Sequence, residues 1–190
     1  VGRSREFWNY FFPILQAHFP NQLASHTADD VYRACNKVMP SLIRTEADEV
    51  TYHFHVLIRY EIEKRLIDGS LATKDLRAAW NEGYQQYLGI TPPDDKRGVL
   101  QDVHWSHGSF GYFPTYSLGS FYGAQFFAHA QQAIPGLNNH IANGDMKKLL
   151  PWLRTNIHCH GRRYDSETLC QKVTGEGLDT NYFLEYVRSK

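Results

Sequence analysis

The amino-acid sequence predicts a mainly α-helical protein. Along most of the chain, apolar residues recur at intervals of three and four, the spacing of an amphipathic helix, whereas the alternation typical of strands is weak. Residues that commonly begin or end helices bound several of these stretches, such as Thr27 at a start and Gly69 and Gly89 at ends. With 190 residues, 42% of them hydrophobic, the chain is long enough for one ordinary domain with a core.

Two helices are predicted near the N-terminus. The first, over 3–19, carries six apolar residues in helical spacing: Phe7, Trp8, Phe11, Phe12, Leu15 and Phe19. Pro13 has no N–H group, so we expect it to bend or split this helix. The second helix, over 27–38, has Thr27 as its predicted N-cap. Its apolar side consists of Val31, Ala34 and Val38.

The strongest helix signal covers residues 45–68. Thr45 to Asp48 resembles a capping box with Asp in place of Glu, and Gly69 supplies a stop. The apolar stripe of this helix consists of Ala47, Val50, Phe54, Leu57 and Ile58. Near its end, Glu61 and Glu63 are interpreted as a solvated surface rather than a carboxylate pair.

An early start of this helix would align four polar residues beside the stripe: Arg44, Asp48, Thr51 and His55. On such a line, Asp48 could hold Arg44 while the guanidinium group faces a carboxylate ligand. The competing interpretation is a solvated helix face with a salt bridge worth a few tenths of a kcal/mol. Periodicity alone favours this second interpretation, because most polar helix faces are solvated.

The remaining helices are predicted over 74–88, 116–133, 144–157, 166–173 and 180–188. For the first of these, Thr73 is the expected cap, and Gly89 followed by two prolines ends the run. Its inward side chains are expected to be Leu76, Trp80, Tyr84 and Tyr87. Residues 90–114 are expected to be irregular.

The irregular segment and the residues just after it contain the highest density of candidate functional side chains in the chain. Between 98 and 116 it contains six polar candidates: Gln101, Asp102, His104, His107, Tyr112 and Tyr116. His104 and His107 could be a metal pair with Asp102 as ligand or orienting group. They could equally donate hydrogen bonds to a developing oxyanion, with a tyrosine beside them. A third interpretation is that these side chains have only a structural role, in which they form hydrogen bonds with backbone groups in an aromatic core.

Composition excludes several classes of protein. The 20 Lys and Arg residues balance the 20 Asp and Glu residues, so no overall field favours nucleic acid or an anionic membrane. No apolar run reaches the roughly 20 residues that span a bilayer. The 3 cysteines contain no CxxC pair, which argues against a disulfide framework or a thiolate zinc site. We therefore expect a cytoplasmic protein with no nucleic-acid or membrane partner.

Two motifs carry a family resemblance. The segment 43–48, IRTEAD, resembles the IRxxAD motif of the thermostable, Taq-type metallocarboxypeptidase family, and 98–105, GVLQDVHW, resembles its GxxQDxHW motif. Similarity extends over essentially the whole chain but covers only the C-terminal part of that family. The resemblance thus implies that 1–190 is a single helical region, the C-terminal segment of a larger domain with a deep-grooved, HExxH-type zinc peptidase fold.

The resemblance also implies an activity, a cofactor and partners. Members of the family are typically homodimers that release single residues from peptide C-termini, with zinc held by two histidines of HExxH and a downstream glutamate. No histidine of this chain is followed by glutamate. We therefore expect the zinc ligands upstream of Val1, in an N-terminal portion of the enzyme that this truncated fragment lacks. The chain alone should retain no tightly bound zinc and be inactive.

Roles transfer only to residues that match the motifs. Arg44 matches the motif arginine and is expected to bind the carboxylate at the substrate C-terminus. Gln101, Asp102 and His104 match the second motif, where the histidine should face the substrate and Gln101 or Asp102 should orient it. Related helical zinc peptidases imply that stabilisation of the tetrahedral intermediate falls to His107, Tyr112 and Tyr116. Of these, His107 and Tyr116 are favoured.

Two alternatives stay open. The chain could be a non-catalytic helical interaction or dimerisation module that keeps the scaffold alone. A zinc site could also be rebuilt from His104, His107 and a carboxylate, although catalytic zinc sites need three well-placed protein ligands.

Overall fold

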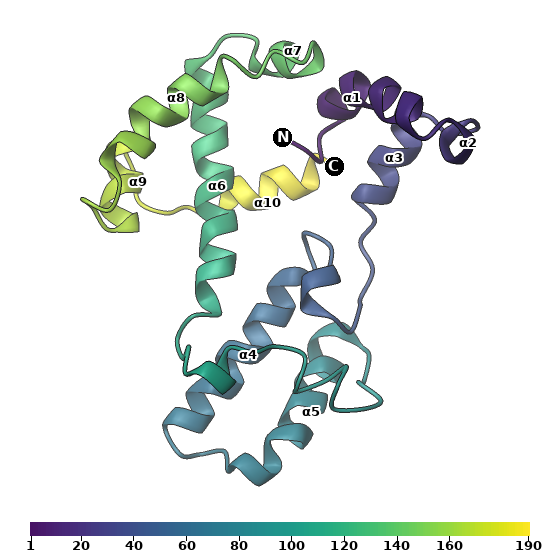
Figure 1. Ribbon diagram of the computed structural model, residues 1–190. Helices are drawn as coiled ribbons and strands as arrows, with labels where there is room; N and C mark the ends of the chain where they lie inside the picture. The colour runs from purple at the N-terminus through teal and green to yellow at the C-terminus, as the bar shows by residue number, and fades with distance from the viewer. The chain divides into compact units, whose positions relative to one another are not determined.

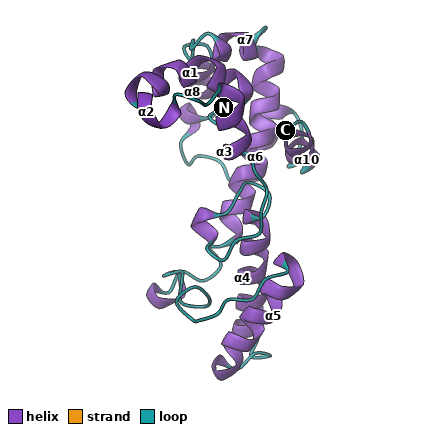
Figure 2. Ribbon diagram, turned by 90° about the vertical axis from the view of Figure 1, so that its right-hand side faces the viewer, coloured by secondary structure: helices purple, strands orange, loops and turns teal.

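The computed structural model describes all 190 residues, and they form helices joined by loops without a strand (Figures 1 and 2). The predicted fold class is confirmed. The α-helices are α1 (Arg5–His18), α2 (Pro20–Leu23), α3 (Ala28–Cys35), α4 (Tyr52–Ile67), α5 (Leu76–Leu88), α6 (Pro114–Ala133), α7 (Leu137–Ala142), α8 (Leu149–Asn156), α9 (Ser166–Thr174) and α10 (Asn181–Arg188).

The chain forms two compact units. The first unit combines Val1–Asn36 with Ser120–Lys190, and the second comprises Lys37–Gly119. Each unit has its own hydrophobic cluster. The prediction that 1–190 is a segment of one larger domain stays a prediction.

Helix α1 of the first unit begins at a cap and runs through its proline. The Ser4 hydroxyl accepts the N–H of Phe7, and the helix continues past Pro13 to His18, so the expected split at Pro13 is wrong. Of the six apolar residues expected to face inward, only Phe12 is buried. The reason is that α1 packs mainly against α3 and α7, and Phe19, beyond its end, is 51% exposed.

Helix α3 confirms its predicted cap but not its predicted apolar side. Thr27 and Asp30 form a reciprocal capping box, in which each side chain accepts the other residue's backbone N–H. The helix ends at Cys35, so Val38 lies outside it and is 56% exposed. The buried residue of this helix is Tyr32.

The cluster of the first unit lies where α6 meets α7. Ala130, Leu137 and Ile141 are buried there, with side chains of α1 and α8 packed around them. Helices α6, α9 and α10 confirm the predictions to within two residues at each end. Helix α7 was not predicted, and the helix expected over 144–157 begins only at Leu149.

Helix α4 of the second unit begins at Tyr52, seven residues later than predicted. Asp48 explains the late start, because its Oδ1 accepts the backbone N–H groups of Val50 and Thr51 and its Oδ2 accepts the Thr51 hydroxyl. These hydrogen bonds stabilise a turn before the helix, which then begins at Tyr52 without a side-chain cap. The capping box at Thr45 and the polar line through Arg44 and Asp48 are therefore wrong.

The buried face of α4 is partly polar. It comprises His55, Val56, Ile58, Arg59, Ile62 and Glu63. From the predicted stripe only Ile58 is buried, and Phe54 is 38% exposed. The interpretation of Glu63 as a solvated residue is wrong, because its side chain lies in this face, whereas Glu61 is exposed as expected.

Helix α5 packs against α4. Trp80 and Tyr84 are buried as predicted, and Gly89, with a φ of 69°, ends the helix in the left-handed conformation that favours glycine. Thr73 does not cap α5, because it starts a short 3-10 turn, Thr73–Asp75, that precedes it. The loop after α5 folds back onto both helices and carries the candidate site.

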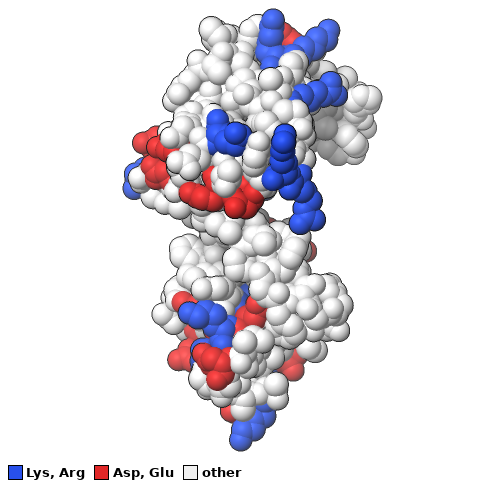
Figure 3. Space-filling model, turned by 90° about the vertical axis from the view of Figure 1, so that its left-hand side faces the viewer, with Lys and Arg blue, Asp and Glu red and all other residues white.

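Charged side chains of both signs occur in each unit on the face drawn in Figure 3, interspersed with uncharged residues. None of the helices combines the length and apolar character that crossing a bilayer requires.

Candidate functional site

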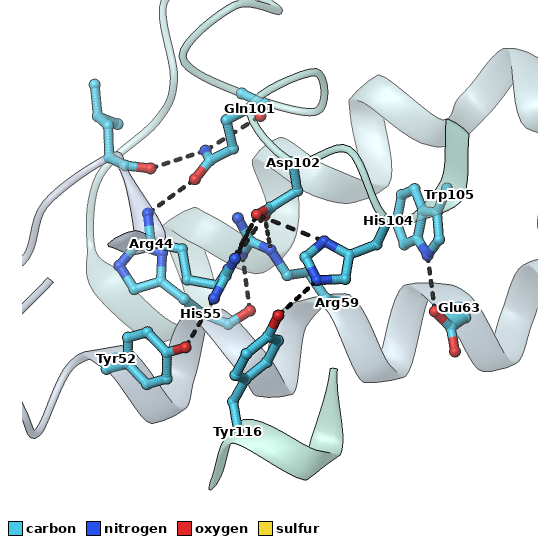
Figure 4. A network of polar contacts seen from close by, with 12 residues as sticks. Arg44, Tyr52, His55, Arg59, Glu63, Gln101, Asp102, His104, Trp105 and Tyr116 are labelled. Carbon is cyan, nitrogen blue, oxygen red and sulfur yellow. Dashed lines mark hydrogen bonds and ion pairs between the residues drawn. The ribbon is translucent and has the colours of Figure 1, made fainter. Parts of the chain in front are cut away.

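Asp102, in the loop after α5, lies between two buried arginines (Figure 4). Its Oδ1 accepts from Nη2 of Arg44 at 2.7 Å, and its Oδ2 accepts from Nε of Arg59 at 2.6 Å. Arg44 stands in the 3-10 turn Arg44–Glu46 and Arg59 on α4, so the carboxylate joins three segments of the second unit. We call these three residues the Asp102 cluster. The partner of Arg44 is Asp102, and the expectation that Asp48 holds it is wrong.

The Asp102 cluster carries one uncompensated positive charge. Burial alone would raise the pKa of Asp102, but hydrogen bonds and charge from Arg44 and Arg59 outweigh it and hold that pKa below its ordinary value. The carboxylate is thus ionised at neutral pH and offsets one of two guanidinium charges. Arg59 is fully buried, with its guanidinium carbon 4.4 Å from the ring centre of Trp80.

Arg44 is the arginine with donors to spare. Its side chain is 7% exposed and uses Nε and Nη2 on Asp102 and Nη1 on the Tyr52 hydroxyl, at 2.7 Å. A guanidinium group has five N–H bonds, so one on each terminal nitrogen is left over. This geometry suits a second, planar anion such as a carboxylate. The solvated-face interpretation of Arg44 is wrong, because the residue is buried.

Gln101 fixes the backbone beside Arg44. Its Oε1 accepts the Arg44 backbone N–H at 2.9 Å, and its Nε2 donates to the Leu42 carbonyl at 2.9 Å. Tyr84 lies behind it and donates its hydroxyl to the same carbonyl at 3.0 Å. Gln101 and Tyr84 therefore hold the segment before α4 against the loop after α5.

His55 is buried next to the cluster and is kept neutral. Its Nδ1 shares a hydrogen bond with the Tyr84 hydroxyl at 3.0 Å, and its Nε2 has no partner. Burial, followed by the charges of Arg59 and Arg44, lowers the pKa of His55 to about 4. This imidazole is uncharged throughout the physiological range.

The low pKa of His55 predicts a loss of stability in mild acid. Between pH 6.5 and 4, His55 is protonated in the unfolded chain but not in the folded chain. The free energy of unfolding therefore falls as the pH falls. The slope is about 1.4 kcal/mol per pH unit from this group. Titration of the His55 ring by NMR should give the low pKa, and His55→Gln should lose this part of the pH dependence. A ring titrating near 6.5 would contradict the burial argument.

His104 is the centre of a group of rings. Its Nε2 shares a hydrogen bond of 2.8 Å with the Tyr116 hydroxyl, and its ring centre lies 6.0 Å from that of His107 and 5.9 Å from that of Tyr112. Its Nδ1 has no hydrogen-bond partner and lies 3.9 Å from Oδ1 of Asp102. Burial, only partly opposed by the charge of Asp102, lowers the pKa of His104, so the neutral imidazole prevails at pH 7.

Exposure differs across this group of rings. His104 is buried, Tyr116 is half-buried, and His107 and Tyr112 are exposed. Nδ1 of His107 shares a hydrogen bond with the Ser109 hydroxyl at 2.9 Å. Arg44 links the group to the Asp102 cluster, because its guanidinium carbon lies 4.8 Å from the ring centre of Tyr116. The structure therefore brings all seven sequence-predicted site residues into one neighbourhood of the second unit.

Sequence reasoning missed Arg59, and it took Tyr84 for a simple core residue. Arg59 stands four residues after His55 and shares its helix face, which is the one signal that could have paired them. Nothing in the spacing indicated that this face is buried, since charged residues on helices are mostly solvated.

The residues present do not fit a metal. No group of three or more His, Cys, Asp or Glu side chains lies close enough together to hold an ion. His104 and His107 stand together without a third ligand, so a zinc site rebuilt from them has no support in the structure.

Comparison with known proteins gives a consistent result. Residues 1–190 match the Carboxypeptidase Taq (M32) metallopeptidase family. Over 190 residues the chain is 46% identical to thermostable carboxypeptidase 1 of Thermus thermophilus and 40% identical to carboxypeptidase 1 of Bacillus subtilis, and it spans 37% and 38% of their lengths. The crystal structure of the M32 carboxypeptidase of Deinococcus radiodurans matches with a TM-score of 0.95 at 45% identity, over all of this chain and 38% of that one.

Proposed function

The chain belongs to the Carboxypeptidase Taq (M32) metallopeptidase family, and on that premise we propose that it is the C-terminal portion of a zinc-dependent metallocarboxypeptidase. The resemblance drawn from two motifs is confirmed at the level of the family. The proposed reaction is the release of single residues from peptide C-termini. The observation that carries the proposal is the match of the whole chain to carboxypeptidases of which it spans only 37–38%.

Arg44 is proposed to bind the free carboxylate at the substrate C-terminus. Support comes from its two spare N–H groups and from the uncompensated charge of the Asp102 cluster. Asp102 and Gln101 hold Arg44 in place. Asp102 accepts a hydrogen bond from its guanidinium group, and Gln101 accepts one from its backbone N–H. An electrically neutral C-terminus, such as an amide, would give up the charge-assisted part of this interaction.

Tyr116 and His107 are proposed to stabilise the tetrahedral intermediate, with Tyr112 beside them. Such donors act by meeting negative charge that develops on the scissile carbonyl oxygen. Tyr116 is half-buried, and its hydroxyl is oriented by its hydrogen bond to His104. In this proposal Nε2 of the neutral His104 is the donor of that bond, and the hydroxyl donates to the substrate. Tyr112 is 50% exposed, which favours Tyr116 over it. His104 faces the substrate in this proposal and aligns Tyr116.

Zinc is proposed to be bound by the part of the enzyme that this chain does not span. When bound there, it would polarise the scissile carbonyl and activate water. The residues of this chain would then form one wall of the site without touching the ion. We also propose that the complete enzyme is a homodimer, as the family resemblance implies.

Joining the chain to the missing part tests this proposal. Alone, with zinc, the chain should release no amino acid from a peptide. Fused behind the portion of the Thermus thermophilus relative that it does not cover, it should release single C-terminal residues when zinc is present. The matched control is the same peptide with a C-terminal amide, which should be cleaved poorly. A fusion that folds, binds zinc and releases nothing would favour a non-catalytic helical interaction or dimerisation module.

A further inference from the structure

Glu63 is a buried carboxylate that the proposed site does not use. Its residue is 6% exposed and lies on the inward face of α4. Its Oε2 accepts the indole N–H of Trp105 at 2.8 Å, and its Oε1 accepts the backbone N–H of Gly111. No Lys or Arg side chain pairs with it. A buried carboxylate without a counter-charge is costly, so packing alone does not explain its presence.

The two donors stand at the ends of one short loop segment, which we call the 105–111 segment. It contains the 3-10 turn Trp105–His107 and two glycines, Gly108 and Gly111, with φ of 81° and 76°. Glycine adopts this left-handed conformation without steric cost, so the two glycines permit the turns of the segment. The two oxygens of Glu63 fix both of its ends to α4.

The side chains that depend on this segment are those proposed to act on the substrate. His107 lies inside it, and Tyr112 follows Gly111 directly. His107 is exposed and, besides its ring contact with His104, makes one side-chain hydrogen bond, to Ser109 in the same segment. Its place relative to α4 is thus set through the backbone, which Glu63 holds directly at Gly111 and through the indole side chain of Trp105 at the other end.

We propose that Glu63 is a positioning residue that holds His107 and Tyr112 in place for the reaction. This inference rests on the proposed function. Both oxygens are needed, because each accepts one N–H donor. A glutamine has only one acceptor oxygen, and its NH₂ group would face the second donor. Glu63→Gln therefore releases one end of the segment while it preserves the size of the side chain.

Steady-state kinetics of the complete enzyme provide the first test. Glu63→Gln should lower kcat roughly 10- to 100-fold, since a displacement of about 1 Å at a reacting group has an effect of this size. KM should change less than about twofold, because Arg44 and its partners do not touch Glu63. Glu61→Gln is the matched control, since Glu61 is exposed two residues earlier and accepts only from the Tyr87 hydroxyl. It should leave both constants unchanged.

Hydrogen exchange in the unsubstituted enzyme gives a second test that needs neither catalysis nor a folded variant. The Gly111 amide should exchange much more slowly than the neighbouring Phe110 amide, which has no hydrogen-bond partner. Equal exchange of the two amides would overturn the proposal, as would an unchanged kcat in folded Glu63→Gln. Absence of carboxypeptidase activity in the unsubstituted enzyme would refute the proposed function instead, and exchange would still show whether Glu63 holds the segment.

Discussion

Asp102→Asn should lower the free energy of unfolding by about 3–5 kcal/mol. The substitution keeps the shape of the side chain and removes the single negative charge between Arg44 and Arg59, whose side chains are 7% and 0% exposed. Two buried guanidinium groups would then face each other without compensation, and the new NH₂ group would oppose one of their donors. Loss of one partner from a buried charge pair is among the largest effects of a point substitution.

The second unit offers a matched control for this prediction. Asp94 is exposed and paired with Arg97 at 2.6 Å, the same distance as that between Asp102 and Arg59. Because solvent screens an exposed pair, Asp94→Asn should change the free energy of unfolding far less than Asp102→Asn does. Denaturant unfolding of both variants measures the difference. Equal, small losses would contradict the account of the Asp102 cluster.

The lowered pKa of Asp102 adds a pH dependence with a defined sign. Its contribution to stability is present above the unfolded pKa of about 3.9 and is lost as the pH falls through the lower folded value. Asp102→Asn should therefore remove part of the acid sensitivity below pH 4. The His55 contribution lies at higher pH and should persist in this variant.

Helical periodicity predicted the helices whose ends are marked by residues that commonly begin or end a helix. Helices α9 and α10 were predicted within about one residue, and α5 ends at the glycine that its sequence indicated. The start of α4 was not predictable in this way. Thr45 and Asp48 offer a plausible cap, but Asp48 uses its oxygens on Val50 and Thr51 instead, and only the folded loop decides between the two.

Of the site, the sequence predicted only the residues in and near the two motifs, and not the contacts between them. Arg44 and Asp102 stand 58 positions apart, and no spacing rule joins such a pair. The two motif resemblances selected both residues but not their contact. The burial of Arg59 and Glu63 was not predicted, because charged residues on helices are mostly solvated. Their burial depends on partners in a loop far along the chain.

The largest expected effect on the reaction belongs to Tyr116. In the proposed function its hydroxyl donates to the developing oxyanion, and loss of one such donor lowers the rate by about 100- to 1,000-fold. The effect should fall on kcat, because the interaction forms in the transition state, while binding of the C-terminal carboxylate through Arg44 persists. Tyr116→Phe keeps the ring over Arg44 and removes only the oxygen that bonds His104.

The value of kcat for Tyr116→Phe in the complete enzyme tests the central claim most directly, with Tyr112→Phe as the comparison because its ring packs edge-on against Tyr116. We expect a folded Tyr116→Phe enzyme with kcat lowered about 100- to 1,000-fold and KM nearly unchanged, and a much smaller effect for Tyr112→Phe. An unchanged kcat in Tyr116→Phe would remove Tyr116 from the reaction and contradict the claim that this chain supplies a group that stabilises the transition state.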